Sequence, residues 1–137
     1  CGEDISYSGS FYKGNQLLVS YVPQDTSFLT GNLSEYAYEN AIDESLFKAI
    51  LRKLDFSRVL FDKDMSEFSA GQKKKVLIAK SLCEKAHLHI WDEPLNYIDV
   101  FSRMQIEELL LSYKPTILFV EHDSAFCQNI ANKIISI

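Results

Sequence analysis

Cysteine, glycine and proline are scarce in this sequence, and long apolar runs are absent. The 3 cysteines are an odd number with no regular spacing, so no disulfide framework is expected and a reducing, cytoplasmic location is favoured. No apolar run approaches the ~18 residues of a membrane-spanning helix, and no charged-then-apolar leader opens the chain. Direct insertion into a membrane is therefore not expected.

Basic residues are outnumbered by acidic ones. The 14 Lys and Arg residues against 19 Asp and Glu residues give a formal net charge of −5, which offers no general electrostatic attraction for nucleic acid. With 47% hydrophobic and 24% charged residues, the composition is that of an ordinary globular domain, and 137 residues suffice for one. Because the first residue is Cys1 rather than methionine, we expect the chain to begin inside a larger protein.

Strand-like and helix-like patterns alternate along most of the chain. Strands are predicted over residues 17–22, 88–91, 116–120 and 133–137, and helices over 32–38, 43–54, 71–83, 100–111 and from 124 onward. This alternation predicts an α/β fold with a parallel sheet covered by helices on both faces. Only helical patterns occur between the first two strands. We therefore expect one domain over residues 1–137, with a core lobe (1–27 and 84–137) and an inserted helical subdomain (28–83).

Two acidic residues follow the second predicted strand. Asp92 and Glu93 would be fixed rigidly at the carboxyl edge of the sheet, where ligands bind in such folds. One carboxylate can hold Mg²⁺, usually through water, and the next can orient or deprotonate an attacking water in phosphoryl transfer. A strand that merely ends in solvated acids is the alternative that this pair alone leaves open.

A hydroxyl and a small turn precede the helix after residue 71. In Phe68-Ser69-Ala70-Gly71-Gln72, the free N–H groups of the helix N-terminus and the Ser69 hydroxyl suit a phosphate, and Gly71 allows close approach of an anion. An ordinary Ser-capped helix followed by a solvated run of lysines, residues 73–75, is the alternative.

Two further polar residues follow strands. His122, after the strand that ends at Val120, could donate a hydrogen bond to a γ-phosphate. Gln24, after Pro23, could contact Mg²⁺ or the attacking water. Each is weak alone, and their value lies in their order along the chain.

Taken together, these motifs resemble the nucleotide-binding domain of ATP-binding cassette (ABC) proteins. Gln24 matches the Q-loop, residues 69–72 the signature, 88–93 the Walker B strand, 96–99 the D-loop, and His122 the switch histidine. The resemblance covers nearly the whole chain and implies a P-loop nucleotide-hydrolase fold that uses ATP and Mg²⁺. It implies catalytic roles for Glu93 and His122, and metal contacts for Asp92 and Gln24. It also implies nucleotide contacts from Gln24, Ser69, Gly71, Gln72 and Asp99.

Within that superfamily, the residues of two motifs are similar to those of the ABC-F branch. Trp91-Asp-Glu-Pro-Leu-Asn-Tyr-Ile-Asp99 and Phe119-Val-Glu-His-Asp123 resemble the antibiotic-resistance group of Gram-positive bacteria. The resemblance implies two cassettes in one chain, packed head to tail, no membrane domain, and action on the ribosome. The alternative is an ATPase subunit of a membrane transporter. A third hypothesis, a non-catalytic interaction module, is disfavoured because Asp92, Glu93 and His122 are all retained.

The sequence departs from the family pattern in two ways. Ala70 stands where the signature usually has glycine. No Gly-x-x-x-x-Gly-Lys-Ser/Thr loop is present: Gly9 and Gly14 have the glycine spacing, but Asn15 and Gln16 follow them. We expect the phosphate loop to lie before Cys1 in a longer parent. The chain is then an N-terminally truncated piece, inactive by itself and prone to self-association through uncovered apolar sheet surface.

Metal binding by cysteine and histidine side chains is a further alternative. Cys83, His87, His89, His122 and Cys127 lack the paired spacing of zinc ligands. A core cysteine and strand-edge histidines are the favoured interpretation.

Overall fold

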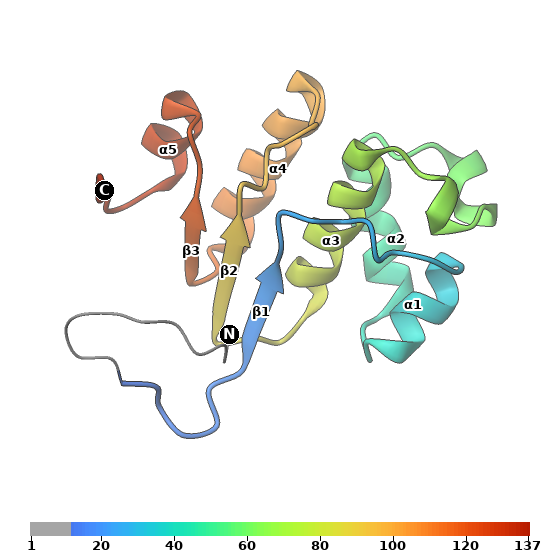
Figure 1. The fold of residues 1–137 in the computed structure, drawn as a ribbon, viewed down its shortest axis with the longest axis horizontal. Helices are drawn as coiled ribbons and strands as arrows, with labels where there is room; N and C mark the ends of the chain where they lie inside the picture. Colours follow the sequence, from blue (N-terminus) through green and yellow to red (C-terminus); the bar gives the residue numbers. More distant parts are fainter. Residues whose placement is uncertain (1–11) are drawn as a thin grey trace.

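The computed structural model describes residues 12–137, which form a three-stranded parallel sheet (Figure 1). The strands are β1 (Val19–Val22), β2 (Leu88–Asp92) and β3 (Ile117–Val120), in the order β1-β2-β3. Parallel strands need long crossover connections, and helices supply both of them. The predicted α/β fold with a parallel sheet is confirmed.

Helices α1 (Leu33–Glu39), α2 (Glu44–Lys53) and α3 (Ala70–Cys83) connect β1 to β2, with two short 3-10 helices (Arg58–Asp62 and Met65–Glu67) between α2 and α3. Helix α4 (Val100–Tyr113) connects β2 to β3, and α5 (Ser124–Ile130) follows β3. A short polar side chain caps the first turn of each α-helix by accepting a backbone N–H. These N-caps are Asn32, Asp43, Ser69, Asp99 and Asp123.

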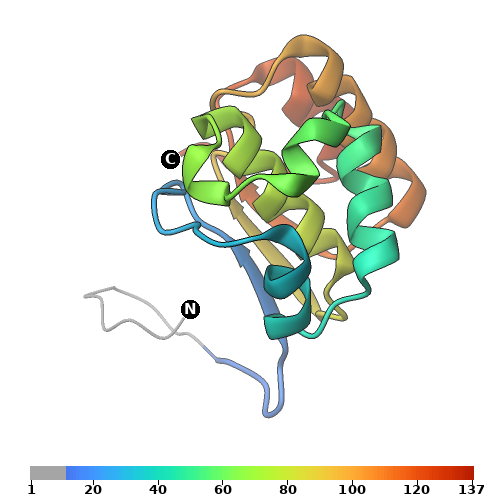
Figure 2. The ribbon, with the colours of Figure 1, turned by 90° about the vertical axis from the view of Figure 1, so that its right-hand side faces the viewer.

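The two faces of the sheet differ. Helices gather on one side of it (Figure 2), and Val22 and Trp91, which are paired across β1 and β2, are buried there. Side chains alternate along a strand, so the intervening residues face the other side. Leu118 and Val120 on that side are 60% and 54% exposed. Within residues 12–137 the prediction of a sheet covered on both faces is therefore wrong.

A buried polar cluster attaches α3 to the covered face. The Ser81 hydroxyl accepts a hydrogen bond from Trp91 Nε1 at 2.8 Å and lies 2.7 Å from Ser20 Oγ and 3.0 Å from His89 Nδ1. Burial lowers the pKa of His89, which favours a neutral imidazole. Because these hydrogen bonds are directional, they fix the position of α3 relative to β1 and β2.

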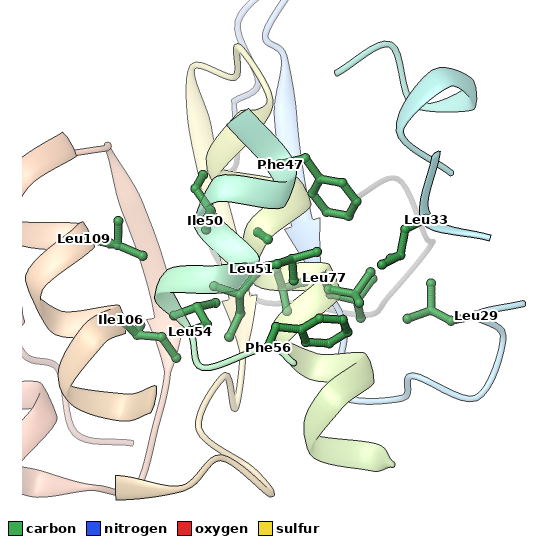
Figure 3. Packing of buried hydrophobic residues seen from close by; sticks show 14 of the residues in the cluster. Leu29, Leu33, Phe47, Ile50, Leu51, Leu54, Phe56, Leu77, Ile106 and Leu109 are labelled. Atoms are coloured by element: carbon green, nitrogen blue, oxygen red, sulfur yellow. The ribbon is translucent and has the colours of Figure 1, made fainter. Parts of the chain in front are cut away.

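The main hydrophobic core lies between α2, α3 and α4 (Figure 3). Phe47, Leu51 and Leu54 are fully buried, Leu77 contributes from α3, and Ile106 contributes from α4. Leu46 has the helical spacing of this inner face of α2, but it is 39% exposed.

The predicted strand at residues 133–137 does not form. This segment has no regular secondary structure, and Ile134 and Ile135 are 58% and 74% exposed. β-branched composition favours a strand only where a neighbouring strand provides ladder hydrogen bonds and burial. In the described part of the chain, β3 pairs only with β2.

Candidate active site

The candidate site lies at the carboxyl ends of the three strands. Gln24 follows β1, Asp92 ends β2 with Glu93 directly after it, and His122 follows β3. The parallel register brings these ends to one edge, because Val22 is paired with Trp91 and Asp92 with Val120. Residues separated by nearly a hundred positions in the sequence thus lie together.

The carboxylate of Glu93 is where the polar side chains converge. Its Oε2 accepts hydrogen bonds from Gln24 Nε2 at 2.9 Å and Asn96 Nδ2 at 2.6 Å. His122 Nε2 lies 3.4 Å from Oε1, with 83% of the His122 side chain exposed. The backbone of Glu93 has φ of 46°, a left-handed conformation that costs a non-glycine residue energy.

Asn96 belongs to the site, although the sequence identified it only as the first residue of the D-loop match at 96–99. Its amide donates to Glu93 Oε2 and its backbone N–H donates to the Glu93 carbonyl at 3.3 Å. An amide three residues after a strand-end carboxylate is a weak signal on its own. The turn that folds it back becomes visible only in three dimensions.

The signature residues form a separate group at the start of α3. Ser69 Oγ accepts the Gln72 backbone N–H at 3.2 Å, and Gln72 Oε1 accepts the Ser69 N–H at 2.9 Å. Within the described part of the chain these hydrogen bonds reach neither Glu93 nor His122. Ser69 and Gln72 thus bond to each other rather than to the strand-end cluster.

Gly71 packs against the turn that follows β2. A Cβ built at Gly71 would overlap the backbone carbonyl oxygen of Tyr97, and Tyr97 itself has φ of 64°. The start of α3 and this turn are in contact within one chain. Glycine is needed at position 71 for that reason, independently of any phosphate.

The lysines after the signature are not a solvated run. Lys74 is fully buried, and its ammonium donates to the carbonyls of Pro23 at 2.9 Å and Gln24 at 3.3 Å. Burial lowers the Lys74 pKa, while the nearby strand-end carboxylates oppose that shift. This side chain ties α3 to the segment that carries Gln24.

Lys75 pairs with the N-cap of α4. Its Nζ lies 3.1 Å from Asp99 Oδ2. Burial raises the Asp99 pKa, but hydrogen bonds from Ser102 and the Lys75 ammonium outweigh it and lower the pKa to about 2. Asp99, an expected nucleotide contact, is thus ionised at neutral pH and fixed between two helices.

A surface depression of about 450 Å³ lies beside the cluster. It is bounded by the segment after β1, the start of α3 and the turn after β2, through Gln24, Asp25, Thr26, Ser27, Ala70, Lys73, Asn96 and Tyr97. The carboxylates of Asp92 and Glu93 do not line it. The depression therefore adjoins the candidate chemistry rather than containing it.

The cluster fits one end of a Mg²⁺–nucleotide. Half-buried Asp92 can bind the metal through water, since Mg²⁺ keeps much of its hydration, and Glu93 stands next to it. Asn15 and Gln16, where the phosphate loop would need Lys and a hydroxyl, form a turn, while Gly9 lies outside the described residues. The strand-end residues thus offer ligands suited to a hydrated Mg²⁺, and Asn15 and Gln16 do not provide the Lys and hydroxyl of a phosphate cradle.

The histidines of the alternative metal site have other partners. His87 Nδ1 accepts the Leu18 N–H at 3.0 Å, and His89 contacts Ser81. Over residues 12–137, no three His, Cys, Asp or Glu residues are grouped so that they could hold a metal ion. None of the helices formed by these residues is long and apolar enough to cross a membrane.

Comparison with known sequences finds relatives that are ABC proteins. The profile of the ABC transporter family matches residues 4–96. The uncharacterized ABC transporter ATP-binding protein YkpA of Bacillus subtilis is 32% identical over 99% of this chain and 26% of its own length. ABC transporter F family member 2 of Arabidopsis thaliana is 31% identical over 75% of this chain and 16% of its own length. The chain thus spans about a quarter or less of these relatives.

Comparison with solved structures supports the same fold. The archaeal ribosome recycling factor aABCE1, in complex with ribosomal stalk protein aP1, matches with a TM-score of 0.71 and 25% identity over 91% of this chain and 26% of its own. A putative cobalt transport ATP-binding protein matches with a TM-score of 0.72 and 22% identity over 91% and 52% of the two chains, which shows the fold alone. The motif order, the strand-end cluster and the family profile agree, and the chain belongs to the ABC transporter family of ATP-binding domains.

Proposed function

We propose that this chain forms part of a cassette that binds and hydrolyses ATP in a two-cassette ABC-F protein acting on the ribosome, with antibiotic resistance as its role. The observation that carries the ATPase part is the convergence of Gln24, Asn96 and His122 on the Glu93 carboxylate. The ABC-F assignment is supported by the F-family relative in Arabidopsis, and the ribosomal assignment by the likeness to the recycling factor aABCE1. A cytoplasmic location follows from this proposal.

Each strand-end residue has a proposed chemical role. Asp92 holds Mg²⁺ through water, and Gln24 contacts the metal or the attacking water. Glu93 accepts the proton of that water or orients it, because its carboxylate adjoins the metal side. His122 is largely exposed and can turn toward a γ-phosphate to donate a hydrogen bond. Bound Mg²⁺ would offset the charge that develops on the phosphoryl oxygens.

The signature group is proposed to act on nucleotide held by a second cassette packed head to tail. Ser69, Gly71 and Gln72 lie at the N-terminus of a 14-residue helix, where free N–H groups and the helix dipole favour an anion. Asp99 would face the same interface. We further propose that residues 28–83 act as a helical subdomain beside a core lobe of residues 1–27 and 84–137.

The ribosomal role is tested by co-sedimentation of the full-length gene product with ribosomes. We expect the Glu93→Gln variant to remain on ribosomes in Mg-ATP and to be released in Mg-ADP, because unhydrolysed ATP keeps the cassettes closed. Glu108→Gln, the same change on an exposed residue of α4, should behave as the wild type. Binding to membranes with a permease, and none to ribosomes, would favour the transporter alternative.

The 137-residue chain alone is not expected to perform this function. Most triphosphate affinity in P-loop enzymes comes from consecutive backbone N–H groups and a lysine at a helix N-terminus, and no such motif occurs in the sequence. We expect calorimetric titration of the chain with Mg-ATP to show no micromolar binding and light scattering to show self-association through the face that exposes Leu118 and Val120. Micromolar binding by a monomer would contradict both expectations.

A further inference from the structure

Glu121 joins the two loops that flank the candidate catalytic carboxylate. This residue follows β3 directly, and its carboxylate accepts three backbone N–H groups. Oε1 accepts from His122 at 2.8 Å and Asp123 at 3.3 Å, both in its own loop. Oε2 accepts from Leu95 at 3.1 Å, in the turn that follows β2. One side chain therefore bridges segments 26 positions apart.

Each of the two bridged loops contacts a different carboxylate oxygen of Glu93. Asn96, directly after Leu95, donates to Glu93 Oε2, while His122 faces Glu93 Oε1. The spacing between Asn96 and His122 thus depends on the carboxylate that connects their backbones. Most of the His122 side chain is exposed, so packing around that side chain does little to hold it in place.

We propose that Glu121 is a positioning residue for ATP hydrolysis, which sets His122 and the turn after β2 in register around Glu93. The inference rests on the proposed function, since it assigns Glu121 a part in the same reaction. Glu121 itself is not proposed to touch nucleotide or water. Its effect is transmitted through the backbone of Leu95 on one side and His122 on the other.

To bridge the two loops, the side chain at position 121 needs two acceptor oxygens and the length of a glutamate. Glutamine has one oxygen, and its NH₂ group cannot accept an N–H, so Glu121→Gln can satisfy one loop and not both. Aspartate keeps both oxygens but is one methylene shorter. In Glu121→Asp the carboxylate can still accept from the adjacent His122 and Asp123, as short side chains commonly do, but cannot reach Leu95. The two variants remove the same bridge by different means.

The surroundings should keep these variants folded. The start of α5 is held separately, because Asp123 Oδ1 caps Phe126 N–H and Asp123 Oδ2 pairs with Arg103 at 2.6 Å. The Glu93 N–H donates to the Val120 carbonyl at 2.9 Å, which keeps β2 and β3 together at this edge. Loss of the Glu121 bridge therefore alters loop spacing rather than strand pairing.

The test is steady-state ATPase kinetics of the full-length gene product. Glu121→Gln and Glu121→Asp should each lower kcat by about tenfold to a hundredfold, the scale of a misplaced catalytic group, with KM for ATP changed less than about twofold. In a His122→Ala background the same changes should lower kcat by a further factor of less than about two, because the effects of residues that act through one another are not additive. Glu108→Gln is the matched control on the surface of α4.

A fully active Glu121→Asp variant, or losses that add to that of His122→Ala, would overturn the inference. A rise in KM with unchanged kcat would do so too, since it would place Glu121 in substrate binding. If Glu93→Gln leaves hydrolysis unchanged, the proposed function fails first and this inference falls with it. If Glu93→Gln abolishes hydrolysis and the Glu121 variants do not slow it, only the inference fails.

Discussion

Glu93→Gln in the full-length gene product is expected to slow ATP hydrolysis by about 10²- to 10⁴-fold, the usual contribution of a general base, while ATP binding persists. Glutamine preserves the shape of the side chain. Its single oxygen can still accept from both Gln24 and Asn96, which donate to one oxygen in the wild type. What the variant loses is the basic oxygen itself, so the effect should appear in kcat rather than in nucleotide affinity.

The measurement is single-turnover hydrolysis together with equilibrium binding of Mg-ATP, with the partner cassette silenced by its own mutation. Glu108→Gln should match the wild type in both assays, since the ion pair of Glu108 with Lys53 is exposed and such pairs contribute little. Hydrolysis at the wild-type rate by Glu93→Gln would reject the assignment of Glu93. Loss of binding together with hydrolysis would instead indicate that the substitution disturbs the cluster.

Gly71→Ala is expected to destabilise the chain by about 1–3 kcal/mol, the usual cost of overpacking a close contact. The added Cβ would overlap the Tyr97 carbonyl oxygen, a backbone atom in a turn that already has a left-handed residue. Either the start of α3 or the turn must move. Gly71→Asp adds a charge at the same place and should cost at least as much.

If the signature acted only on nucleotide held by the second cassette, Gly71→Asp would weaken ATP-driven closure of the cassettes and leave folding little altered. The contact with Tyr97 contradicts the second half of that expectation. Reduced closure in the variant would therefore combine an interface effect with a displaced turn.

Urea unfolding of the chain with Gly71→Ala, beside Gly14→Ala, separates these contributions. A Cβ at Gly14 would meet nothing within 4 Å, so that control adds the same atom without a clash. We expect a lower unfolding midpoint for the first variant only. Equal midpoints would show that the turn accommodates the methyl group, and the effect of position 71 on closure would then belong to the interface.

The sequence by itself determined which segments become strands and helices and where their polar ends lie. Each predicted strand that pairs in the structure has a run of β-branched or aromatic residues, and each predicted helix start has a short polar cap. These features depend on neighbours within about four residues, so composition and spacing reveal them. The segment 133–137 was mispredicted because a strand also needs a partner, which its own residues do not specify.

The tertiary structure alone decided which of those polar ends meet. Lys74 resembles a surface lysine in the sequence, yet it is buried against carbonyls 50 and 51 positions away. Glu121 reaches Leu95 across 26 positions, and Gly71 meets Tyr97 through the packing of α3 beside the turn after β2. The parallel register of β1, β2 and β3 brings their carboxyl ends to one edge. The physical reason is that a hydrogen bond or a steric contact depends on distance in space, and only packing of the helices on the sheet converts sequence separation into distance.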